Sequence, residues 1–412
     1  MVPEATRALR PGVRRAVTIV ALTAAWISAG ATPLTEAIAG APAPTDFARD
    51  YVSVQAHVRG HDAVDNDYAA ALGVPAVVLL DAPYYAHPPT ALLALLPFAA
   101  LGFHAAALAW LCLTLVALGA LAVMLTRIAA PARSPAVALV AFALLALWPP
   151  VLHDLAKGQW SILLATLIAA AWLALERGQA RAAGIWLGLA AAMKATPLIL
   201  LGYLWLRWRR AAWAMLATIG ALVALTVARF GIVPWRAWFA QARPNVLAWQ
   251  TWIASTASLN GAVARLLTTS AFCRPLVDAP ALAQTLTLVL AAMLVGATII
   301  ATRAAPPSPR DDRRLFAAWT VLTVLLNPLG WTHTVIIALV GLALVAEAPA
   351  LAAVLVALTV PRETLAALAG PLPVSPARGL ALSIHAAALL VLLGVSLRRA
   401  ELGGAAPIGP SS

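Results

Sequence analysis

The chain has 412 residues, of which 62% are hydrophobic and only 11% are charged. Soluble domains carry about a quarter charged residues, so this chain has too few charges to cover a water-exposed surface of its size. Two cysteines are too few for a disulfide framework, and the apolar fraction excludes a disordered chain. The composition therefore predicts an integral membrane protein.

The charge balance is strongly basic, with 28 Lys and Arg against 16 Asp and Glu, which gives a formal net charge of +12. In a soluble protein this balance would suggest nucleic acid as a partner. In a membrane protein, an excess of arginine in the cytoplasmic loops produces the same balance. Because no basic run alternates with aromatic residues, we expect the lipid bilayer as a partner and no nucleic acid.

The first apolar segment covers residues 16–31 and follows four arginines, Arg7, Arg10, Arg14 and Arg15. A signal peptide has the same order of charge and apolar residues, and residues 39–43 resemble a cleavage site. We favour an uncleaved first span because many further spans follow. The arginines place the N-terminus in the cytoplasm.

A long polar stretch, residues 33–89, holds seven of the sixteen carboxylates. The apolar block after it, residues 90–124, is too long for one span and short for two. We therefore predict a partial helix, a turn near Gly102 and a full span that ends at Arg127.

Further spans are predicted at residues 134–152, 160–176, 182–194, 196–206, 211–229, 283–302, 315–327, 332–346, 350–360 and 378–397. The arginine-rich connectors are every second connector between these segments, which places all of them and both termini on the cytoplasmic side. The predicted fold is an all-α integral membrane protein, a single domain over residues 1–397 with about 10–12 transmembrane helices. External loops at about 33–89 and 230–282 carry interfacial helices, and residues 398–412 form a disordered cytoplasmic tail.

The clearest candidate for chemistry is an acidic pair, Asp46 and Asp50, in a helix predicted to continue to about Arg59. Residues four positions apart share a helix face, and two nearby carboxylates raise one pKa, which suits a general base. The alternative is structural: Asp46 caps the helix and Asp50 is solvated. The spacing by itself favours that alternative.

Four other clusters lie at helix junctions. Pro88-Pro89 after His87 is a helix start signal, and Lys157 precedes another predicted external helix start. Lys194 lies between two short helices, where it either snorkels to the interface or binds an anion. His333 follows a break at residues 327–331 and begins the next span on the external side.

In this order the motifs resemble the GT-C polyprenyl-phosphate-dependent glycosyltransferases, specifically glycosyltransferase family 87. The resemblance covers roughly residues 16–346 and rests on Asp46-Phe47, Tyr85 to Pro89, Gly158-Gln159, Gly188 to Pro197, Ser258 to Gly261 and Pro328 to His333. Each motif by itself is a weak indication of this family, whereas six of them in the same order indicate it specifically. The chain departs from the family pattern at residues 256–260 and at Thr332 and Thr334, and these departures concern the identity of the donor or acceptor sugar.

The resemblance implies an inverting hexosyltransferase, with mannose as the favoured sugar, a polyprenyl-phosphate donor and a cell-envelope glycolipid or glycan acceptor on the external face. Asp46 would be the catalytic base, with Asp50 as the second choice. The implied substrate-binding residues are Tyr85, His87, Lys157, Gln159, Lys194, Arg243, Asn260 and His333. This chemistry requires no metal and no cofactor.

Three alternatives stay open. The donor sugar could be arabinofuranose, the chain could be a transporter or flippase of lipid-linked sugars without transfer chemistry, or it could be a non-catalytic relative that only binds lipid. Asp65-Asn66-Asp67 resembles the metal site of nucleotide-sugar transferases, but nucleotide sugars are cytoplasmic and this loop is predicted to lie outside. Transporters place charged residues along a midplane path, whereas these carboxylates concentrate in one external loop, which favours the enzyme.

Overall fold

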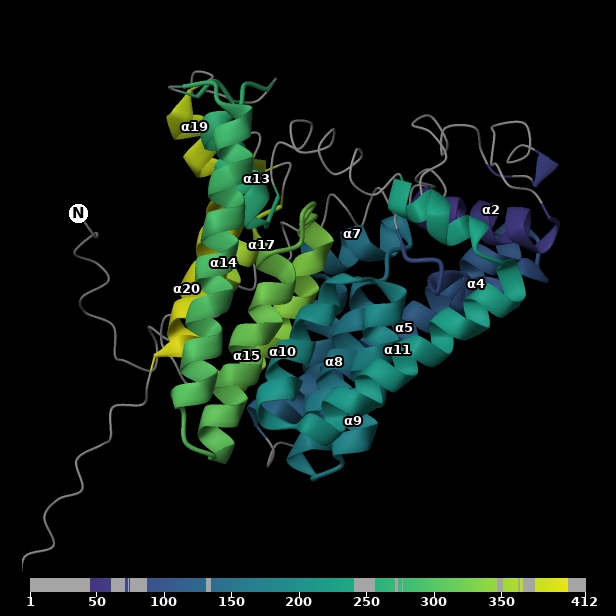
Figure 1. Ribbon diagram of the computed structural model, residues 1–412, viewed down its shortest axis with the longest axis horizontal. Coiled ribbons are helices and arrows are strands. Elements are labelled where there is room, and N and C mark those ends of the chain that lie inside the picture. The colour runs from purple at the N-terminus through teal and green to yellow at the C-terminus, as the bar shows by residue number, and fades with distance from the viewer. Residues whose placement is uncertain are drawn as a thin grey trace, which may run out of the picture.

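The computed structural model describes residues 45–60, 71–72, 74, 87–130, 135–240, 256–270, 273–275, 277–346, 351–361, 364–365 and 375–398. Across these residues all regular structure is helical and no strand occurs, which confirms the predicted all-α fold (Figure 1). The predicted first span at 16–31 and nearly all of the predicted tail lie outside the described residues.

Three helices are long and apolar enough to cross a bilayer: α5 (Phe103–Ala129), α11 (Arg209–Phe230) and α14 (Pro280–Ala304). A fourth candidate is the pair α6 (Pro135–Ala146) and α7 (Pro149–Lys157), which is bent by 67°. The chain is therefore a multi-pass membrane protein. The larger count of ten to twelve crossings stays a prediction, because the remaining apolar helices are each shorter than a full span.

The N-terminal helix α2 (Thr45–Val58) is bonded to the turn between α4 (Ala91–Ala99) and α5. Tyr51 Oη donates to the Leu101 carbonyl at 2.7 Å, and Gln55 Nε2 donates to the Ala99 carbonyl at 2.9 Å. The predicted break near Gly102 is confirmed, since Gly102 directly precedes α5. These two bonds hold α2 against the break between α4 and α5.

The bend between α6 and α7 follows from Pro149 and Pro150, which occupy the first positions of α7. Proline is tolerated there because the first amides of a helix have no intrahelical partner. The prediction of one span at 134–152 followed by a turn at 154–159 was wrong in detail: α7 continues to Lys157. The prolines break the span and restart a helix within it.

The middle of the chain forms α8 (Ser161–Glu176), α9 (Ala180–Met193), η3 (Thr196–Ile199), α10 (Leu200–Arg207) and α11. Helix α9 packs along α11 through Gly184 and Gly188, one turn apart. A Cβ added to Gly184 would lie 2.1 Å from the Ala211 carbonyl oxygen, and one added to Gly188 would lie 2.7 Å from Thr218 Cβ. Small residues at this spacing let two membrane helices approach backbone to backbone.

Replacing Gly184 by alanine is therefore expected to destabilise the protein by about 2–3 kcal/mol, because the new methyl group overpacks a backbone contact. The measurement is the apparent melting temperature of the detergent-solubilised protein. Gly220→Ala is the matched control, since Gly220 lies on α11 with no atom within 4 Å of an added Cβ. Equal melting temperatures for the two variants would contradict the close contact.

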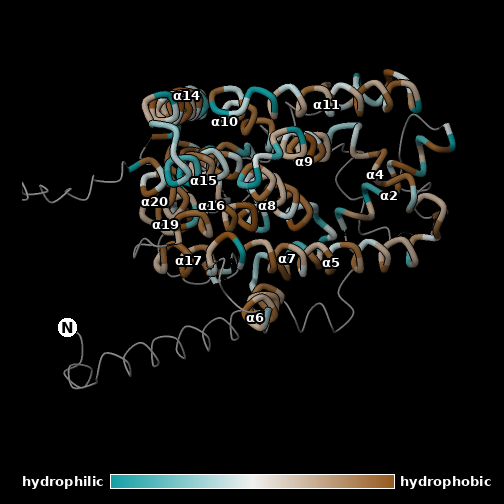
Figure 2. The backbone as a smooth tube through the Cα atoms, turned by 90° about the horizontal axis from the view of Figure 1, so that it is seen from below, coloured by the Kyte–Doolittle hydropathy of each residue, from teal (hydrophilic) through white to brown (hydrophobic). Residues whose placement is uncertain are grey.

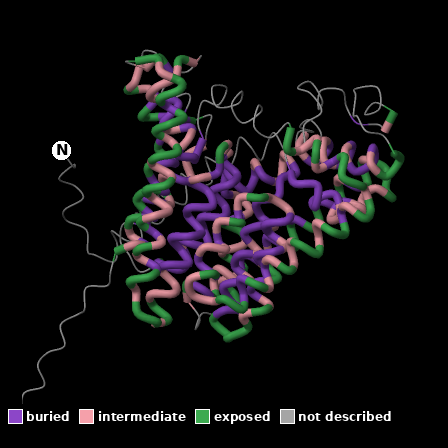
Figure 3. The backbone as a smooth tube through the Cα atoms, viewed as in Figure 1, coloured by how far each residue is buried: buried purple, intermediate pink, exposed green. Residues whose placement is uncertain are grey.

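The C-terminal half contains α13 (Leu259–Leu267), α14, α15 (Pro309–Leu325), η4 (Thr332–Ile337), α16 (Ala338–Leu344), α17 (Leu351–Thr359), α19 (Pro376–Ala381) and α20 (Ile384–Leu397). The predicted span at 378–397 is divided between α19 and α20. Helix α15 is the central element, since every residue of 315–325 is buried. Figure 3 shows the buried residues in the middle of the molecule and exposed residues along α14 and α11 at its edges.

The outward faces of the peripheral helices are apolar. Val116 on α5 is 72% exposed, and Leu288 and Ile300 on α14 are 71% and 70% exposed. Hydrophobic residues also predominate along α5 and α6 in Figure 2. Such faces are unfavourable in water and are satisfied by lipid tails, so they agree with the multi-pass assignment.

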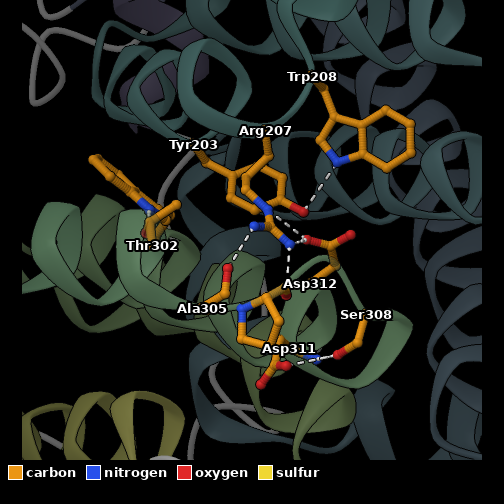
Figure 4. Close-up of polar contacts among 10 residues, drawn as sticks. Tyr203, Arg207, Trp208, Thr302, Ala305, Ser308, Asp311 and Asp312 are labelled. Carbon is orange, nitrogen blue, oxygen red and sulfur yellow. Dashed lines mark hydrogen bonds and ion pairs between the residues drawn. The ribbon is translucent and has the colours of Figure 1, made fainter.

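A polar cluster ties α10 to the connection between α14 and α15 (Figure 4). Arg207 binds Asp312, with Nη2 and Oδ1 2.8 Å apart, and Nη1 donates to the Ala305 carbonyl at 3.0 Å. Ser308 caps α15 by accepting the Asp311 amide at 3.1 Å. This connection lies at the bottom in Figure 1, whereas α2, α7, α13 and α19 lie toward the top. Which end faces the cytoplasm stays a prediction.

Candidate active site

The acidic pair on α2 faces two consecutive residues of the connection between α7 and α8. Gln159 Nε2 donates to Asp46 Oδ2 at 2.5 Å, and Trp160 Nε1 donates to Asp50 Oδ2 at 2.8 Å. The predicted helix from Asp46 is confirmed as α2, and the two carboxylates share one face of it as expected. Both are therefore part of the packed structure and not free in a loop.

Gly158 shapes the turn that presents Gln159 and Trp160. Its φ of +66° is a left-handed conformation that favours glycine. The Gly158 amide donates to the Leu155 carbonyl at 3.1 Å, and the Gln159 amide donates to the Asp154 carbonyl at 2.9 Å. This pair of bonds is the Schellman motif, which ends a helix and redirects the chain. The Gly-Gln pair is thus the end of α7.

The two carboxylates differ in the number of hydrogen bonds that they accept from described residues. Asp50 accepts at both oxygens, because His87 Nδ1 lies 3.1 Å from Oδ1 and donates to it. Its side chain is 13% exposed, and the His87 side chain is 5% exposed. For Asp46, only Oδ2 has a bonding partner among the described residues. No described residue bonds to Asp46 Oδ1.

An aromatic cluster packs around the groups that bond to this pair. Phe47 stacks on Trp110 with ring centroids 5.3 Å apart, and Trp110 meets Trp160 edge to face at 4.7 Å. His87 packs against Trp160 with centroids 5.4 Å apart. These rings are buried, so they fix the orientation of the groups that bond to Asp50.

Lys194 ends α9 at the junction with η3. The two helices cannot join because Pro197 follows at the second position of η3 and disfavours a continuous helix. The lysine is half-buried and lies within electrostatic range of Asp154, Asp46 and Asp50. Its backbone amide donates to the Ala190 carbonyl at 3.1 Å, whereas its side-chain ammonium has no hydrogen bond or ion pair with any described residue.

His333 is the second residue of η4 and is 2% exposed. Neither ring nitrogen has a hydrogen-bond partner among the described residues. Its ring lies 5.5 Å from that of His153, centroid to centroid, and it is within electrostatic range of Lys194, His87 and Lys157. A buried imidazole without a hydrogen-bond partner costs free energy. The N–H of the His333 ring could therefore donate to a bound ligand.

Sequence reasoning missed two residues on α7. His153 lies beside His333, and Asp154 is fully buried within electrostatic range of Lys194. An ionisable pair directly after the predicted span at 134–152 was a signal that could have identified them. The structure thus brings together Asp46, Asp50, His87, Lys157, Gln159, Lys194 and His333 with these two residues.

The other predicted site residues are placed differently. Asn260 Nδ2 donates to the Pro328 carbonyl at 3.0 Å, so it supports the turn that precedes His333. Tyr85 and Arg243 lie outside the described residues, as does Asp65-Asn66-Asp67. None of these three can be related to the cluster.

The turn at residues 327–331 also packs against the start of α13. The Ala257 amide donates to the Gly330 carbonyl at 2.7 Å, and Gly330 has a φ of +37°. A Cβ added to Gly330 would lie 2.6 Å from Ser258 Cβ. This contact fixes the start of η4 and therefore the position of His333.

Replacing Gly330 by alanine is expected to lower activity and the melting temperature, because the backbone strain of about 1–3 kcal/mol adds to the clash with Ser258. Gly178→Ala is the control, since Gly178 also has a positive φ, +71°, but no atom within 4 Å of an added Cβ. Thermal unfolding and sugar transfer are measured for both. A control variant that loses as much activity would show that strain alone, and not the position of η4, matters.

Arg265 holds a second, separate cluster. Its guanidinium donates to Ser383 Oγ at 2.9 Å and to the Thr256 carbonyl at 3.1 Å. Burial lowers its pKa to about 10 and raises the pKa of the nearby Cys273 thiol. The raised thiol pKa disfavours a reactive thiolate, so this cluster joins α13 to α20 and offers no nucleophile.

Comparison with protein families matches Glycosyltransferase family 87 over residues 85–328. The match covers more than half of the chain, so the chain belongs to glycosyltransferase family 87. The searches of curated proteins and of solved structures find no match. The matched span contains Lys157, Gln159 and Lys194, whereas Asp46, Asp50 and His333 lie outside it and are joined to it by the contacts described above.

Proposed function

We propose that this protein transfers a sugar, with mannose as the proposed sugar, from a polyprenyl-phosphate donor to a cell-envelope glycolipid or glycan on the external face of the membrane. The observation that carries the proposal is that Lys194 lies within electrostatic range of both Asp46 and His333. Asp46 Oδ1, the Lys194 ammonium and the His333 ring have no hydrogen-bond partner among the described residues. A base and a phosphate-binding pair are the two parts that the reaction needs.

In the proposed step, the acceptor hydroxyl oxygen attacks the anomeric carbon of the donor sugar. Asp46 Oδ1 takes the hydroxyl proton as the new C–O bond forms, and the bond between the anomeric carbon and the phosphate oxygen breaks. The electron pair of that bond leaves with the polyprenyl phosphate. One displacement inverts the anomeric configuration, and Gln159 holds the carboxylate by donating to Oδ2.

The leaving phosphate gains negative charge, which preorganised donors stabilise best in a site with little water. The Lys194 ammonium and the N–H of His333 are the two donors, and Lys157 adds positive charge within electrostatic range of His333. Asp50 serves by holding His87 and Trp160, since both of its oxygens are already bonded.

The test is transfer by the purified protein in lipid nanodiscs from radiolabelled polyprenyl-phospho-mannose or polyprenyl-phospho-arabinofuranose to a lipid extract. We expect a mannosylated product with inverted configuration. Product from the arabinofuranose donor alone would overturn the proposed sugar and keep the reaction class. No product from either donor, together with movement of the labelled lipid across vesicles, would support a flippase instead.

A further inference from the structure

His87 begins a short, rigid segment that leads into α4. Pro88 and Pro89 follow it, and every residue from His87 to Thr90 is buried. Each proline ring restricts its own backbone and that of the residue before it, and the Pro88 carbonyl accepts the Ala91 amide at 2.8 Å. The His87 side chain therefore projects from a fixed backbone.

This segment is bonded at both ends to other parts of the site. At one end, His87 Nδ1 donates to Asp50 Oδ1 at 3.1 Å, one helical turn from the proposed base. At the other end, the Thr90 hydroxyl donates to the Ala192 carbonyl, two residues before Lys194 at the end of α9. The segment therefore connects the acidic face of α2 to the junction that carries the lysine.

The proposed displacement places the transferred sugar between the same two parts. The acceptor hydroxyl attacks the anomeric carbon from the side opposite to the leaving phosphate. The sugar ring therefore lies between the base, Asp46, and the phosphate-binding groups, Lys194 and His333. Because His87 is tied to both sides of this interval, it is the described side chain best placed to contact the sugar itself.

The His87 ring has a free nitrogen for such a contact. A carboxylate only accepts, so Nδ1 carries the hydrogen that bonds to Asp50. No described residue bonds to Nε2. A sugar hydroxyl both donates and accepts, so it can bond to Nε2 whether that nitrogen is protonated or not.

Trp160 keeps the ring in this orientation. Its Nε1 donates to Asp50 Oδ2 at 2.8 Å, and its ring packs against that of His87 with centroids 5.4 Å apart. The imidazole is thus held both by the carboxylate and by the indole that binds the same carboxylate. A group held in this way is preorganised to recognise a ligand.

We infer that His87 recognises a hydroxyl group of the transferred sugar through Nε2 and thereby contributes to the choice of donor. The inference rests on the proposed function for the identity of the ligand and adds a specificity-determining residue to it. A purely structural His87 would only hold Asp50, and its contribution would not depend on the sugar.

His87→Asn separates the two roles, because the asparagine amide nitrogen can occupy the position of Nδ1 and donate to Asp50, while no atom replaces Nε2. The assay is binding to the full-length protein in lipid nanodiscs without acceptor, with polyprenyl-phospho-mannose and with polyprenyl phosphate as ligands. We expect the variant to bind the mannosyl lipid about five- to tenfold more weakly, as for one lost hydrogen bond in a buried site. Its binding of polyprenyl phosphate should be unchanged.

Two variants serve as comparisons. Lys194→Met should weaken the binding of both lipids, because both carry the phosphate. His57→Asn is the matched control, since His57 also bonds through Nδ1, to the Ser53 carbonyl at 2.7 Å, but lies at the C-terminal end of α2 beside Phe230. It should bind both lipids as wild type does.

Monodeoxy derivatives of the mannosyl lipid identify the hydroxyl that His87 recognises. We expect one derivative to bind wild type about five- to tenfold more weakly than the parent lipid. That difference should disappear in His87→Asn, because the removed hydroxyl and the removed nitrogen are partners. His87→Gln places an amide near the position of Nε2 and gives up the bond to Asp50, so it should keep more of the difference than His87→Asn.

Two results would overturn the inference: equal weakening of both lipids by His87→Asn, or additive losses for every monodeoxy lipid. The unchanged binding of polyprenyl phosphate also shows that the variant is folded. If the binding differences appear but wild type transfers no sugar, the proposed transfer fails while the recognition of the sugar by His87 stands.

Discussion

Asp46→Asn is expected to abolish sugar transfer while α2 stays in place. The amide has nearly the same shape and its oxygen can still accept from Gln159, which bonds to Asp46 at 2.5 Å. What is lost is the proton acceptor at the open oxygen. Because general base catalysis contributes about 10²–10⁴-fold, the transfer rate should fall by that factor. Donor binding, measured with polyprenyl phosphate, should be unchanged.

Asp50→Asn is the matched comparison, one turn along the same helix. Asp50 accepts from Trp160 with one oxygen and from His87 with the other. An asparagine keeps one accepting oxygen, but its amide nitrogen cannot accept the second bond. We therefore expect a lower melting temperature and a smaller loss of transfer for this variant. If Asp50→Asn abolishes transfer with normal stability and Asp46→Asn does not, the two roles are exchanged.

His333→Gln is expected to lower the transfer rate by about 10²–10³-fold, the range observed when one preorganised donor to a developing charge is removed. The ring is buried with both nitrogens unpartnered among the described residues, so its bonds are available to a ligand. Because the phosphate charge grows during the reaction, the loss should appear mainly in the rate of the bound complex and less in donor affinity.

His385→Gln is the control for that variant. His385 is also fully buried, but it contacts the Val360 carbonyl at 2.9 Å and lies on α20, near Arg265. We expect lower stability with little change in the transfer rate per folded molecule. A loss of activity equal to that of His333→Gln would indicate that removing any buried imidazole is sufficient, and would exclude a specific role for His333.

The sequence predicted much of the helical order because apolar length and helix breakers act locally. The break near Gly102, the junction at Lys194 and the helix that begins near Asp46 all appear as expected. Each depends on signals within a few residues: a glycine, a proline or a polar start before an apolar run. The family was also predicted from short ordered motifs and is confirmed over residues 85–328.

What could not be predicted depends on packing between distant segments. No local signal indicates that Asp50 bonds to Trp160 and His87, or that His153 lies beside His333. Gly188 illustrates the same limit, since its motif suggested ligand chemistry while its contact is with Thr218 on α11. Spacing identifies residues that share a face, and only the tertiary arrangement shows what that face meets.

The family match begins at Tyr85, after α2, although α2 supplies two of the three carboxylates of the cluster, Asp46 and Asp50. Asp46 and Asp50 therefore come from a stretch of chain before the matched segment, whereas Gln159, Trp160 and Lys194 come from within it. A chimera that joined α2 of one protein to the matched segment of another would have to bring these two stretches together. The contacts of Gln159 and Trp160 with α2 are the interface across which such a chimera would have to be compatible.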